Sequence, residues 1–198
     1  MAEIYWRADN IATIAGFLSA AECDDYIALG EATGFEDAPI TTSRGMIMMK
    51  DVRNNNRVMI DDPARALALY QRLADDLPPR FQQRWWPVAF NERLRLYRYD
   101  IGQQFDWHRD GYFERPNGER SQFTFMVYLN DDFEGGATTF SDDGFGFGTS
   151  GMLRITPAKG MGLLFHHPIL HRGDPVSAGR KYVLRTDVMY RRIATLTA

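Results

Sequence analysis

The residues best suited to bind a metal lie in the second half of the chain, which holds all four histidines, His108, His166, His167 and His171. His108 and Asp110 form the sharpest pair. Residues two apart on a β-strand point to the same face, so an imidazole nitrogen and a carboxylate oxygen can meet one ion. A late histidine would supply the third ligand. Two histidines and one carboxylate bind non-haem Fe(II) with open coordination positions, and they also bind catalytic zinc.

His171 is the best candidate for the third ligand, because it stands at a predicted strand–loop junction, where binding sites are often built. His166 and His167 are interpreted as structural residues or as neighbours of the ligands. Alone, the pattern His-x-Asp recurs by chance. The alternative interpretation makes His108 a hydrogen-bonded histidine of a barrel and Asp110 a turn residue.

A second polar group lies on residues 181–188, which are predicted to form a strand. One face of this strand carries Lys181, Arg185 and Asp187, whereas the other is mainly apolar. A polar face suits an organic anion, since a buried carboxylate needs a cation nearby. Arg185 can bind such a carboxylate in bidentate fashion, or pair with Asp110 or Asp187.

The elements that must position these residues change in type near residue 90. Before it, Ser19 to Glu22 forms a capping box, and Asp62-Pro63 starts a second helix that should end before Pro78. After it, short segments rich in β-branched and aromatic residues are separated by glycine and asparagine. The predicted strands are 94–99, 105–108, 122–129, 137–140, 152–155, 162–166 and 182–190.

Many short strands with turns between them predict a sandwich or barrel, with the helices bracing one face. The 198 residues suit one domain with a sizeable core. We expect a single domain over 1–198, in which 1–90 form a helical support region and 91–192 the β-core.

The composition argues against several partners. A formal net charge of −3 and a pI of about 5.8 give no electrostatic case for nucleic acid or an anionic membrane surface. No stretch approaches the ~20 apolar residues of a membrane span, and the charged first residues do not resemble a signal peptide. The single cysteine, Cys23, allows no intrachain disulfide. We therefore expect a cytoplasmic location.

A series of motifs follows in order along most of the chain. They are Phe17-Leu18-Ser19 with Glu22-Cys23, Asn91 to Arg95, Tyr99 to Phe105 leading into His108-Arg109-Asp110, Tyr128 to Asp131, Glu134 to Thr138, Gly160 to Phe165, and His171, Gly173, Pro175-Val176, Gly179 and Lys181. In this order and spacing they resemble the prolyl-hydroxylase-like branch of the 2-oxoglutarate and Fe(II)-dependent oxygenases.

The resemblance implies a mainly β fold with flanking helices, namely a double-stranded β-helix, or jelly roll, related to the cupins. It implies that His108, Asp110 and His171 are the iron ligands and catalytic residues. The implied cofactors are Fe(II), 2-oxoglutarate and O2, with ascorbate as an additional one.

The same resemblance implies a binding site for the cosubstrate. Lys181 and Tyr128 match residues that hold the distal carboxylate of 2-oxoglutarate, and Tyr99 matches a tyrosine beside the cosubstrate near the metal. Thr124 shares the face of Tyr128 and is expected to line the pocket. Arg185 is a further candidate, so the sequence leaves open whether it or Lys181 is the main anchor.

Some residues depart from the family pattern. His166-His167 stands where an aromatic or small polar residue is usual, Arg120-Ser121 where a single arginine is common, and Phe105 where a tyrosine is common. Three segments are candidates for the substrate entrance: 41–57, 111–120 and the glycine-rich 141–151.

We therefore expect a dioxygenase that hydroxylates an unactivated C–H bond and releases succinate and CO2. Its substrate would be a prolyl or related residue, in a protein or peptide or as a small molecule. Two alternatives stay open: a cupin-type isomerase or hydrolase using zinc or manganese, and a non-catalytic module that binds metal or 2-oxoglutarate. The sequence does not decide between a monomer and a homodimer.

Overall fold

The computed structural model describes residues 3–42, 45–77, 80–141 and 151–192. In this part of the chain, two helices, α1 (Ala20–Thr33) and α2 (Pro63–Gln71), accompany a fold made mostly of strands. The strands are β1 (Glu3–Ala8), β2 (Ile11–Ala15), β3 (Glu36–Asp37), β4 (Ile40–Thr42), β5 (Gly45–Ile47), β6 (Asn56–Asp61), β7 (Trp85–Phe90), β8 (Arg93–Tyr99), β9 (Phe105–His108), β10 (Arg120–Tyr128), β11 (Glu134–Gly135), β12 (Thr138–Ser141), β13 (Met152–Ile155), β14 (Gly162–His166), β15 (Leu170–Gly173), β16 (Val176–Ala178) and β17 (Lys181–Arg192).

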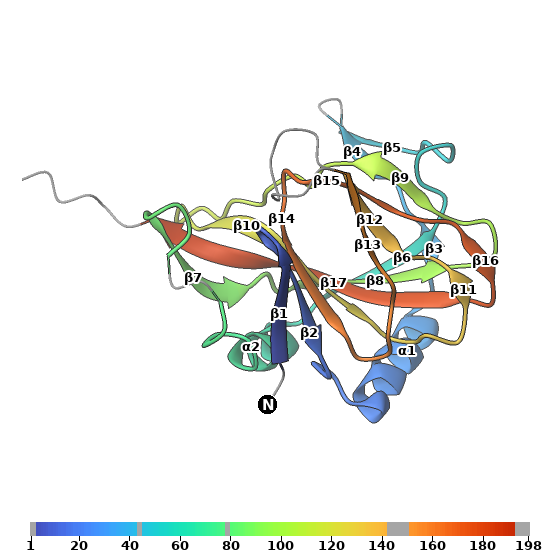
Figure 1. The fold of residues 1–198 in the computed structure, drawn as a ribbon, viewed down its shortest axis with the longest axis horizontal. Coiled ribbons are helices and arrows are strands. Elements are labelled where there is room, and N and C mark those ends of the chain that lie inside the picture. The colour runs from blue at the N-terminus through green and yellow to red at the C-terminus, as the bar shows by residue number, and fades with distance from the viewer. Residues whose placement is uncertain (1–2, 43–44, 78–79, 142–150, 193–198) are drawn as a thin grey trace, which may run out of the picture.

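Two sheets form the body of the protein. The large sheet has the order β1-β2-β14-β10-β17-β8-β6-β3, with β7 also paired to β17, and the smaller one has the order β13-β12-β15-β9. The smaller sheet lies on one side of the large sheet and both helices lie on the other (Figure 1). This arrangement confirms the predicted mainly β jelly roll with flanking helices.

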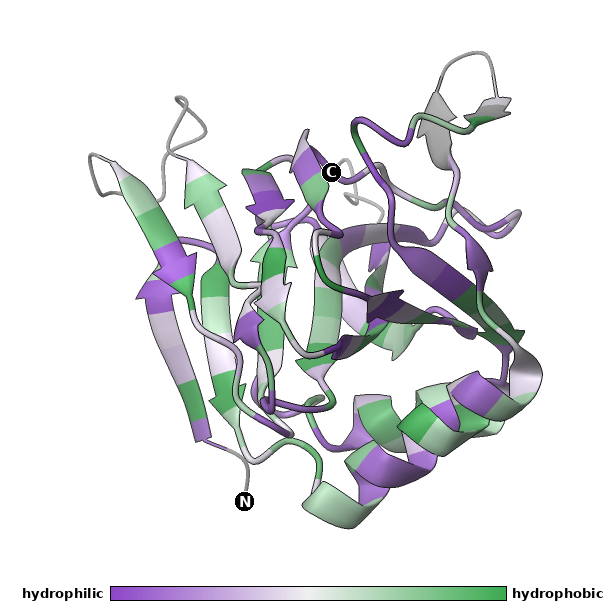
Figure 2. Cartoon of the chain, turned by 90° about the vertical axis from the view of Figure 1, so that its right-hand side faces the viewer, coloured by the Kyte–Doolittle hydropathy of each residue, from purple (hydrophilic) through white to green (hydrophobic). Residues whose placement is uncertain are grey.

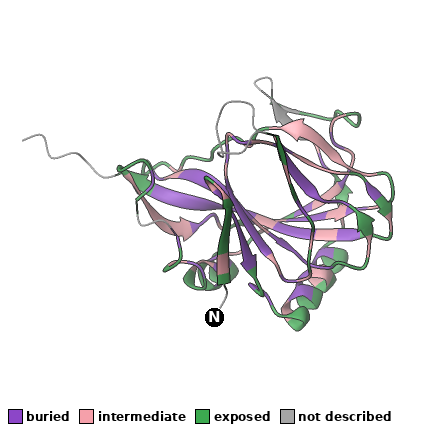
Figure 3. Cartoon of the chain, viewed as in Figure 1, coloured by how far each residue is buried: buried purple, intermediate pink, exposed green. Residues whose placement is uncertain are grey.

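Side chains alternate along β17, so this one strand contributes residues to two apolar clusters on opposite faces of the large sheet. Leu184 belongs to the apolar cluster that joins the large sheet to the helices. Val183 belongs to a second cluster, which lies between the two sheets. Lys181, Arg185 and Asp187 share the face of Val183, as predicted from the period of two. Hydrophobic and hydrophilic bands alternate along the strands (Figure 2), and the central strands are mostly buried whereas the edge strand β1 is mostly exposed (Figure 3).

Both predicted helix starts are confirmed. Ser19 caps α1, because its side chain accepts from the Glu22 backbone N–H while Glu22 accepts from the Ser19 backbone N–H, which completes the capping box. Asp62 caps α2 through a bond of 2.9 Å from the Arg65 backbone N–H. The second helix ends at Gln71, earlier than predicted. Turns then follow, and they still bury Leu73 and Leu77 in the core.

Ser19→Ala is expected to lower the free energy of unfolding by about 1 kcal/mol, since an N-cap hydroxyl satisfies a backbone donor that alanine leaves free. Urea unfolding followed by circular dichroism measures the change. Ser177→Ala, at an exposed position outside any helix cap, should change stability by less than about 0.5 kcal/mol. Equal losses in the two variants would contradict the capping role.

The first 90 residues are less helical than predicted. Besides the two helices they contain β1 to β7, and five of these strands belong to the large sheet. Their partners lie far along the chain: β2 pairs with β14, and β6 pairs with β8. The region is therefore part of the barrel wall as well as a support for it.

The seven strands predicted after residue 90 are all present, with ends within a few residues of the prediction. No helix in the described part of the chain combines the length and hydropathy that a membrane-spanning helix requires.

Candidate metal centre

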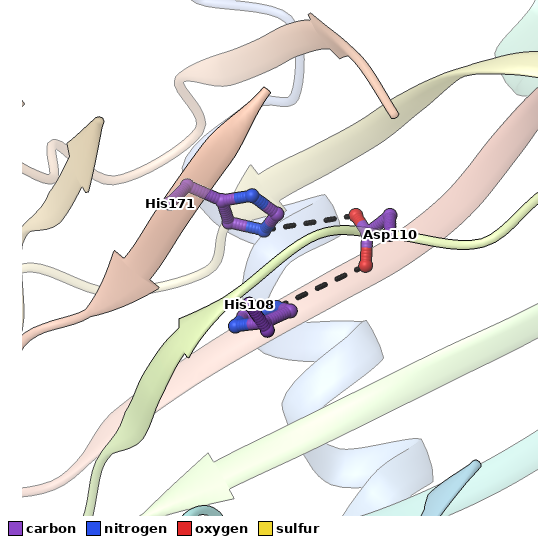
Figure 4. Close-up of side chains that lie close together, drawn as sticks. All are labelled: His108, Asp110 and His171. Carbon is purple, nitrogen blue, oxygen red and sulfur yellow. Dashed lines mark ion pairs between the residues drawn. The ribbon is translucent and has the colours of Figure 1, made fainter. Parts of the chain in front are cut away.

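Two neighbouring strands of the smaller sheet bring the predicted ligands together. His108 ends β9, and in the register of the sheet it stands opposite His171 on β15. Asp110 follows β9 directly, and its backbone N–H donates to the carbonyl of His167 at 3.0 Å. The imidazole rings of the two histidines have their centroids 4.2 Å apart. All three side chains therefore converge on one point (Figure 4).

The donor atoms are close enough to share one cation. A nitrogen or oxygen from each of His108, Asp110 and His171 lies within 4.8 Å of the others. The Asp110 carboxylate oxygens lie 3.8 Å from His108 Nε2 and 3.7 Å from His171 Nε2. Two nitrogens and one oxygen on one side of an ion leave its other side open, which suits an iron site that must also bind other molecules.

Backbone carbonyls fix which nitrogen of each imidazole faces the centre. His108 Nδ1 donates to the Asp106 carbonyl at 2.7 Å, and His171 Nδ1 donates to the Ile169 carbonyl at 2.9 Å. Because Nδ1 carries the proton in both rings, each Nε2 offers a lone pair toward Asp110. Burial, together with the neighbouring His171, lowers the pKa of His108 to about 3. Both rings are thus held in the neutral form that binds a metal.

Asp110 is held as a buried carboxylate. Burial alone would raise its pKa, but the Arg185 guanidinium and the neighbouring histidines keep the pKa of Asp110 below its usual range. Arg185 Nη2 lies 3.0 Å from one carboxylate oxygen, and the Thr124 hydroxyl donates to the other at 2.5 Å. The residue can therefore offer a negative charge to a metal.

A chain of hydrogen bonds behind Asp110 accounts for His167. The Thr124 proton goes to the carboxylate, so Thr124 Oγ1 accepts from His167 Nδ1 at 3.0 Å. His167 Nε2 then accepts from the Ser121 hydroxyl at 2.8 Å. Since both ring nitrogens are engaged, His167 is not in position to replace a ligand. His166 stacks on other rings instead, with the centroid of Phe81 4.8 Å away.

A cavity, named here the inner cavity, opens beside the three candidate ligands. Four of the five predicted cosubstrate-binding residues line it: Tyr99, Thr124, Lys181 and Arg185. Lys181 is 2% exposed. Its ammonium donates to the Gly136 carbonyl at 2.6 Å and lies 5.1 Å from the centre of the Tyr99 ring. It is therefore a buried cation on the wall of the cavity.

The fifth predicted residue, Tyr128, stands behind this wall. Its hydroxyl lies 2.7 Å from Thr138 Oγ1, and Thr138 rather than Tyr128 is among the described residues that line the cavity. Sequence reasoning missed Thr138 as a site residue, although it ends the Gly-Gly-Ala-Thr motif. It also missed Tyr97, whose position two residues before Tyr99 on β8 signals the same face.

The fold and the site together define a class: jelly-roll proteins with a candidate mononuclear metal centre of two histidines and one carboxylate. Within this class, residues 94–186 match the family model of the 2OG-Fe(II) oxygenase superfamily. The match covers 93 of the 198 residues, and this part includes all three candidate ligands. This match implies Fe(II), 2-oxoglutarate and O2 as cofactors, and the donor set of the centre fits Fe(II).

Plant prolyl 4-hydroxylases are among the similar sequences. A probable prolyl 4-hydroxylase 9 from Arabidopsis thaliana is 33% identical over 116 residues, which cover 49% of this chain and 40% of the relative. Prolyl 4-hydroxylase 2 from the same plant is 27% identical over 195 residues, covering 84% of this chain and 62% of the relative. The chain thus spans less than two thirds of the length of either relative.

Solved structures share the fold. A viral collagen prolyl hydroxylase from Paramecium bursaria Chlorella virus-1, in complex with 2OG, superposes with a TM-score of 0.58 at 21% identity and covers 91% of this chain and 96% of its own. A Trichoplax adhaerens prolyl hydroxylase bound to a peptide fragment of hypoxia inducible factor gives a TM-score of 0.66 at 17% identity, with 90% and 83% covered. At these identities the likeness concerns the fold alone.

Proposed function

We propose that the chain is a 2-oxoglutarate- and Fe(II)-dependent dioxygenase that hydroxylates a C–H bond of a prolyl or other amino-acid residue. One oxygen atom of O2 enters the new hydroxyl group, and the other enters succinate as 2-oxoglutarate loses CO2. The proposal depends above all on one observation. Two imidazole Nε2 atoms and the Asp110 carboxylate face one another on the wall of a cavity that also contains the buried cation Lys181.

In this proposal His108, Asp110 and His171 hold the iron. Bound iron supplies the activation of O2 and the oxidation of the C–H bond. The chain's own contribution is to orient the two imidazole rings and to keep the Asp110 carboxylate charged. Backbone carbonyls fix the two rings, and Thr124 and Arg185 hold the carboxylate in its charged form. The buried site also keeps out water that would compete for the open positions.

Lys181 is proposed as the main anchor of 2-oxoglutarate. Among the described residues its hydrogen-bond partner is the neutral Gly136 carbonyl, so a distal carboxylate would gain a charge-assisted bond there. Arg185, in contrast, already has two carboxylate partners, Asp110 at 3.0 Å and Asp187 at 3.5 Å. We therefore assign Arg185 to the metal side of the site. Tyr99 would pack against the cosubstrate, and Tyr128 would act through Thr138.

The affinity for 2-oxoglutarate should fall as the pH rises above neutrality. Burial lowers the pKa of Lys181 to about 7, so the free protein loses this proton above that pH, whereas the dianion binds the charged form. Binding must then take up a proton, and the dissociation constant should rise up to about tenfold per pH unit. Calorimetry in buffers of different ionisation enthalpy measures this uptake.

The sign of the linked stability follows from the same pKa. Lys181 has a folded pKa of about 7, below the ordinary lysine pKa of 10.5. Between these values the unfolded chain binds more protons, so the stability of the ligand-free protein should rise with pH across this window. Absence of proton uptake on binding near about pH 8.5 would mean that Lys181 stays charged without the cosubstrate.

The proposed function is tested first by anaerobic titration. Fe(II) and 2-oxoglutarate together should give a visible charge-transfer band, which neither component gives alone, because the cosubstrate must bind the metal directly. No band with the wild-type chain would falsify the cosubstrate assignment. Succinate formation then separates the rivals: an isomerase or hydrolase with zinc or manganese would form none, and a binding module would give the band without turnover.

Further parts of the proposal concern context. We assign the substrate to peptides or small molecules that contain a prolyl or related residue, in line with the names of the relatives, and we assign ascorbate as a reductant of the iron. Residues 1–198 would act as a single domain, as a monomer or homodimer. The one cysteine, Cys23, is a buried free thiol, which supports a reducing, cytoplasmic location.

A further inference from the structure

A second cavity, named here the outer cavity, adjoins the candidate metal centre. It shares His108, Asp110 and Arg185 with the inner cavity, but Lys181 and Thr138 do not line it. A molecule held there would lie beside the candidate metal centre without contacting the proposed 2-oxoglutarate anchor, Lys181.

The wall of the outer cavity is strongly basic, although the whole chain carries a formal net charge of −3. Five arginines and two aspartates line it. Both aspartates already have partners, because Asp187 lies 3.1 Å from Arg95 and Asp110 lies 3.0 Å from Arg185. No ion pair with a described residue neutralises Arg53 or Arg57. The cavity therefore has positive charge in excess.

Arg53 is held in place with hydrogen-bonding capacity to spare. It is 4% exposed, and its guanidinium lies 4.7 Å from the centre of the Tyr97 ring and 4.5 Å from that of Phe105. Its Nε donates to Asn55 at 2.7 Å, but its Nη2 has no partner among the described residues. A buried donor without an acceptor is costly, so a ligand oxygen at this point would be stabilising.

Arg57 is surrounded by other positively charged side chains of the cavity wall. Burial lowers its pKa, and the neighbouring guanidinium groups of Arg53, Arg95 and Arg185 lower it further, against the opposing effect of Tyr97. Like charges brought together in a partly buried cavity repel one another. An anion between them would remove this repulsion, which a neutral ligand could not do.

We propose that the outer cavity binds an anionic group of the substrate, a carboxylate or a phosphate, and that Arg53 and Arg57 are its ligands. This inference rests on the proposed function, because it is the substrate of that reaction whose charge is specified. Planar guanidinium groups bind such oxyanions in bidentate geometry. The anion would hold the substrate so that a nearby C–H bond faces the centre formed by His108, Asp110 and His171.

The test compares two probes that differ only in charge, N-acetyl-L-proline and N-acetyl-L-prolinamide. Calorimetry under argon measures their binding to the full chain, alone and loaded with Fe(II) and 2-oxoglutarate. The acid should bind at least about tenfold more tightly than the amide, the effect of one charge-assisted contact. Added to the loaded protein, the acid should not displace 2-oxoglutarate. Inorganic phosphate as competitor separates the two anions: displacement of the acid indicates a phosphate site, and no displacement indicates a carboxylate site.

Two variants test whether Arg53 and Arg57 cause the preference for the acid over the amide. Arg57→Gln and Arg53→Gln should each weaken the acid about tenfold and leave the amide unchanged. Arg84→Gln, which removes an exposed arginine outside the cavity, should change neither. Arg57 is the decisive position, because it is only partly buried and its loss should not disturb folding.

Three results would overturn the inference: equal binding of acid and amide, an unchanged preference in Arg57→Gln, or displacement of 2-oxoglutarate by the acid. Failure of the proposed function looks different. If the acid binds selectively but no succinate forms with any substrate, the anion site stands and the reaction does not. If the amide is hydroxylated as fast as the acid, the reaction stands and the anion site does not.

Discussion

His171→Ala is expected to lose tight iron binding and to slow turnover by more than about a hundredfold. Mutation of residues that merely orient a metal ligand typically costs roughly ten- to a hundredfold, so loss of a ligand should exceed that range. The substitution removes the Nε2 atom that lies 3.7 Å from Asp110. Iron content after anaerobic reconstitution and the rate of succinate formation give the two measurements.

His166→Ala is the matched control for this prediction. His166 ends β14 in the large sheet, where its ring packs against Phe81 and Phe123 with centroids 4.8 and 5.4 Å away. Its loss should reduce stability through packing but leave iron binding intact. If His166→Ala loses iron and His171→Ala keeps it, the third ligand has been assigned to the wrong histidine.

The strands around the site could be predicted because their pattern is local. β9, β13 and β14 have the predicted bounds, since each is a short segment rich in apolar or aromatic residues between turn residues. The alternation along β17 likewise predicted that Lys181, Arg185 and Asp187 share a face. These features depend on neighbours in the sequence, and no knowledge of the tertiary fold is needed to find them.

The strands before residue 90 escaped prediction because their stability comes from distant partners. β2 (Ile11–Ala15) is a short, almost completely buried run without alternation, which periodicity cannot distinguish from a piece of helix. β6 (Asn56–Asp61) has a mixed polar sequence and owes its place to pairing with β8. Tertiary pairing overrides local propensity in both cases.

The environment of the centre could not be predicted for a similar reason. His167 is explained by Thr124 and Ser121, which precede it by 43 and 46 residues. Arg53 lies in a segment that the sequence suggested only as a possible entrance, yet it is among the most buried charged residues described. Another suggested entrance segment, 141–151, lies almost wholly outside the described residues. Sequence reasoning thus identified the candidate ligands and Arg185 as a partner of Asp110, but not the hydrogen bonds that fix the histidines.

Lys181→Met should change two properties in opposite directions. Binding of 2-oxoglutarate should weaken by two to three powers of ten, since loss of the partner of a buried charge costs about 3–5 kcal/mol and each ~1.4 kcal/mol is tenfold. The ligand-free protein should become more stable, because methionine fills a similar volume without burying an ammonium beside a lone carbonyl oxygen. Calorimetric titration and thermal unfolding without ligand measure the two effects.

If Lys181 had only a structural role, Lys181→Met would lower the melting temperature of the ligand-free protein, because a stabilising residue would be lost. Lys159→Met provides the control. This lysine pairs with Asp24 at 2.6 Å near the surface, so neither the stability of the free protein nor the binding of 2-oxoglutarate should change measurably. If Lys181→Met destabilises the free protein and still binds the cosubstrate, the lysine is part of the scaffold. The gain in stability together with the loss of binding is expected because, among the described residues, the Lys181 ammonium hydrogen-bonds only the neutral Gly136 carbonyl and requires an anion to complete its site.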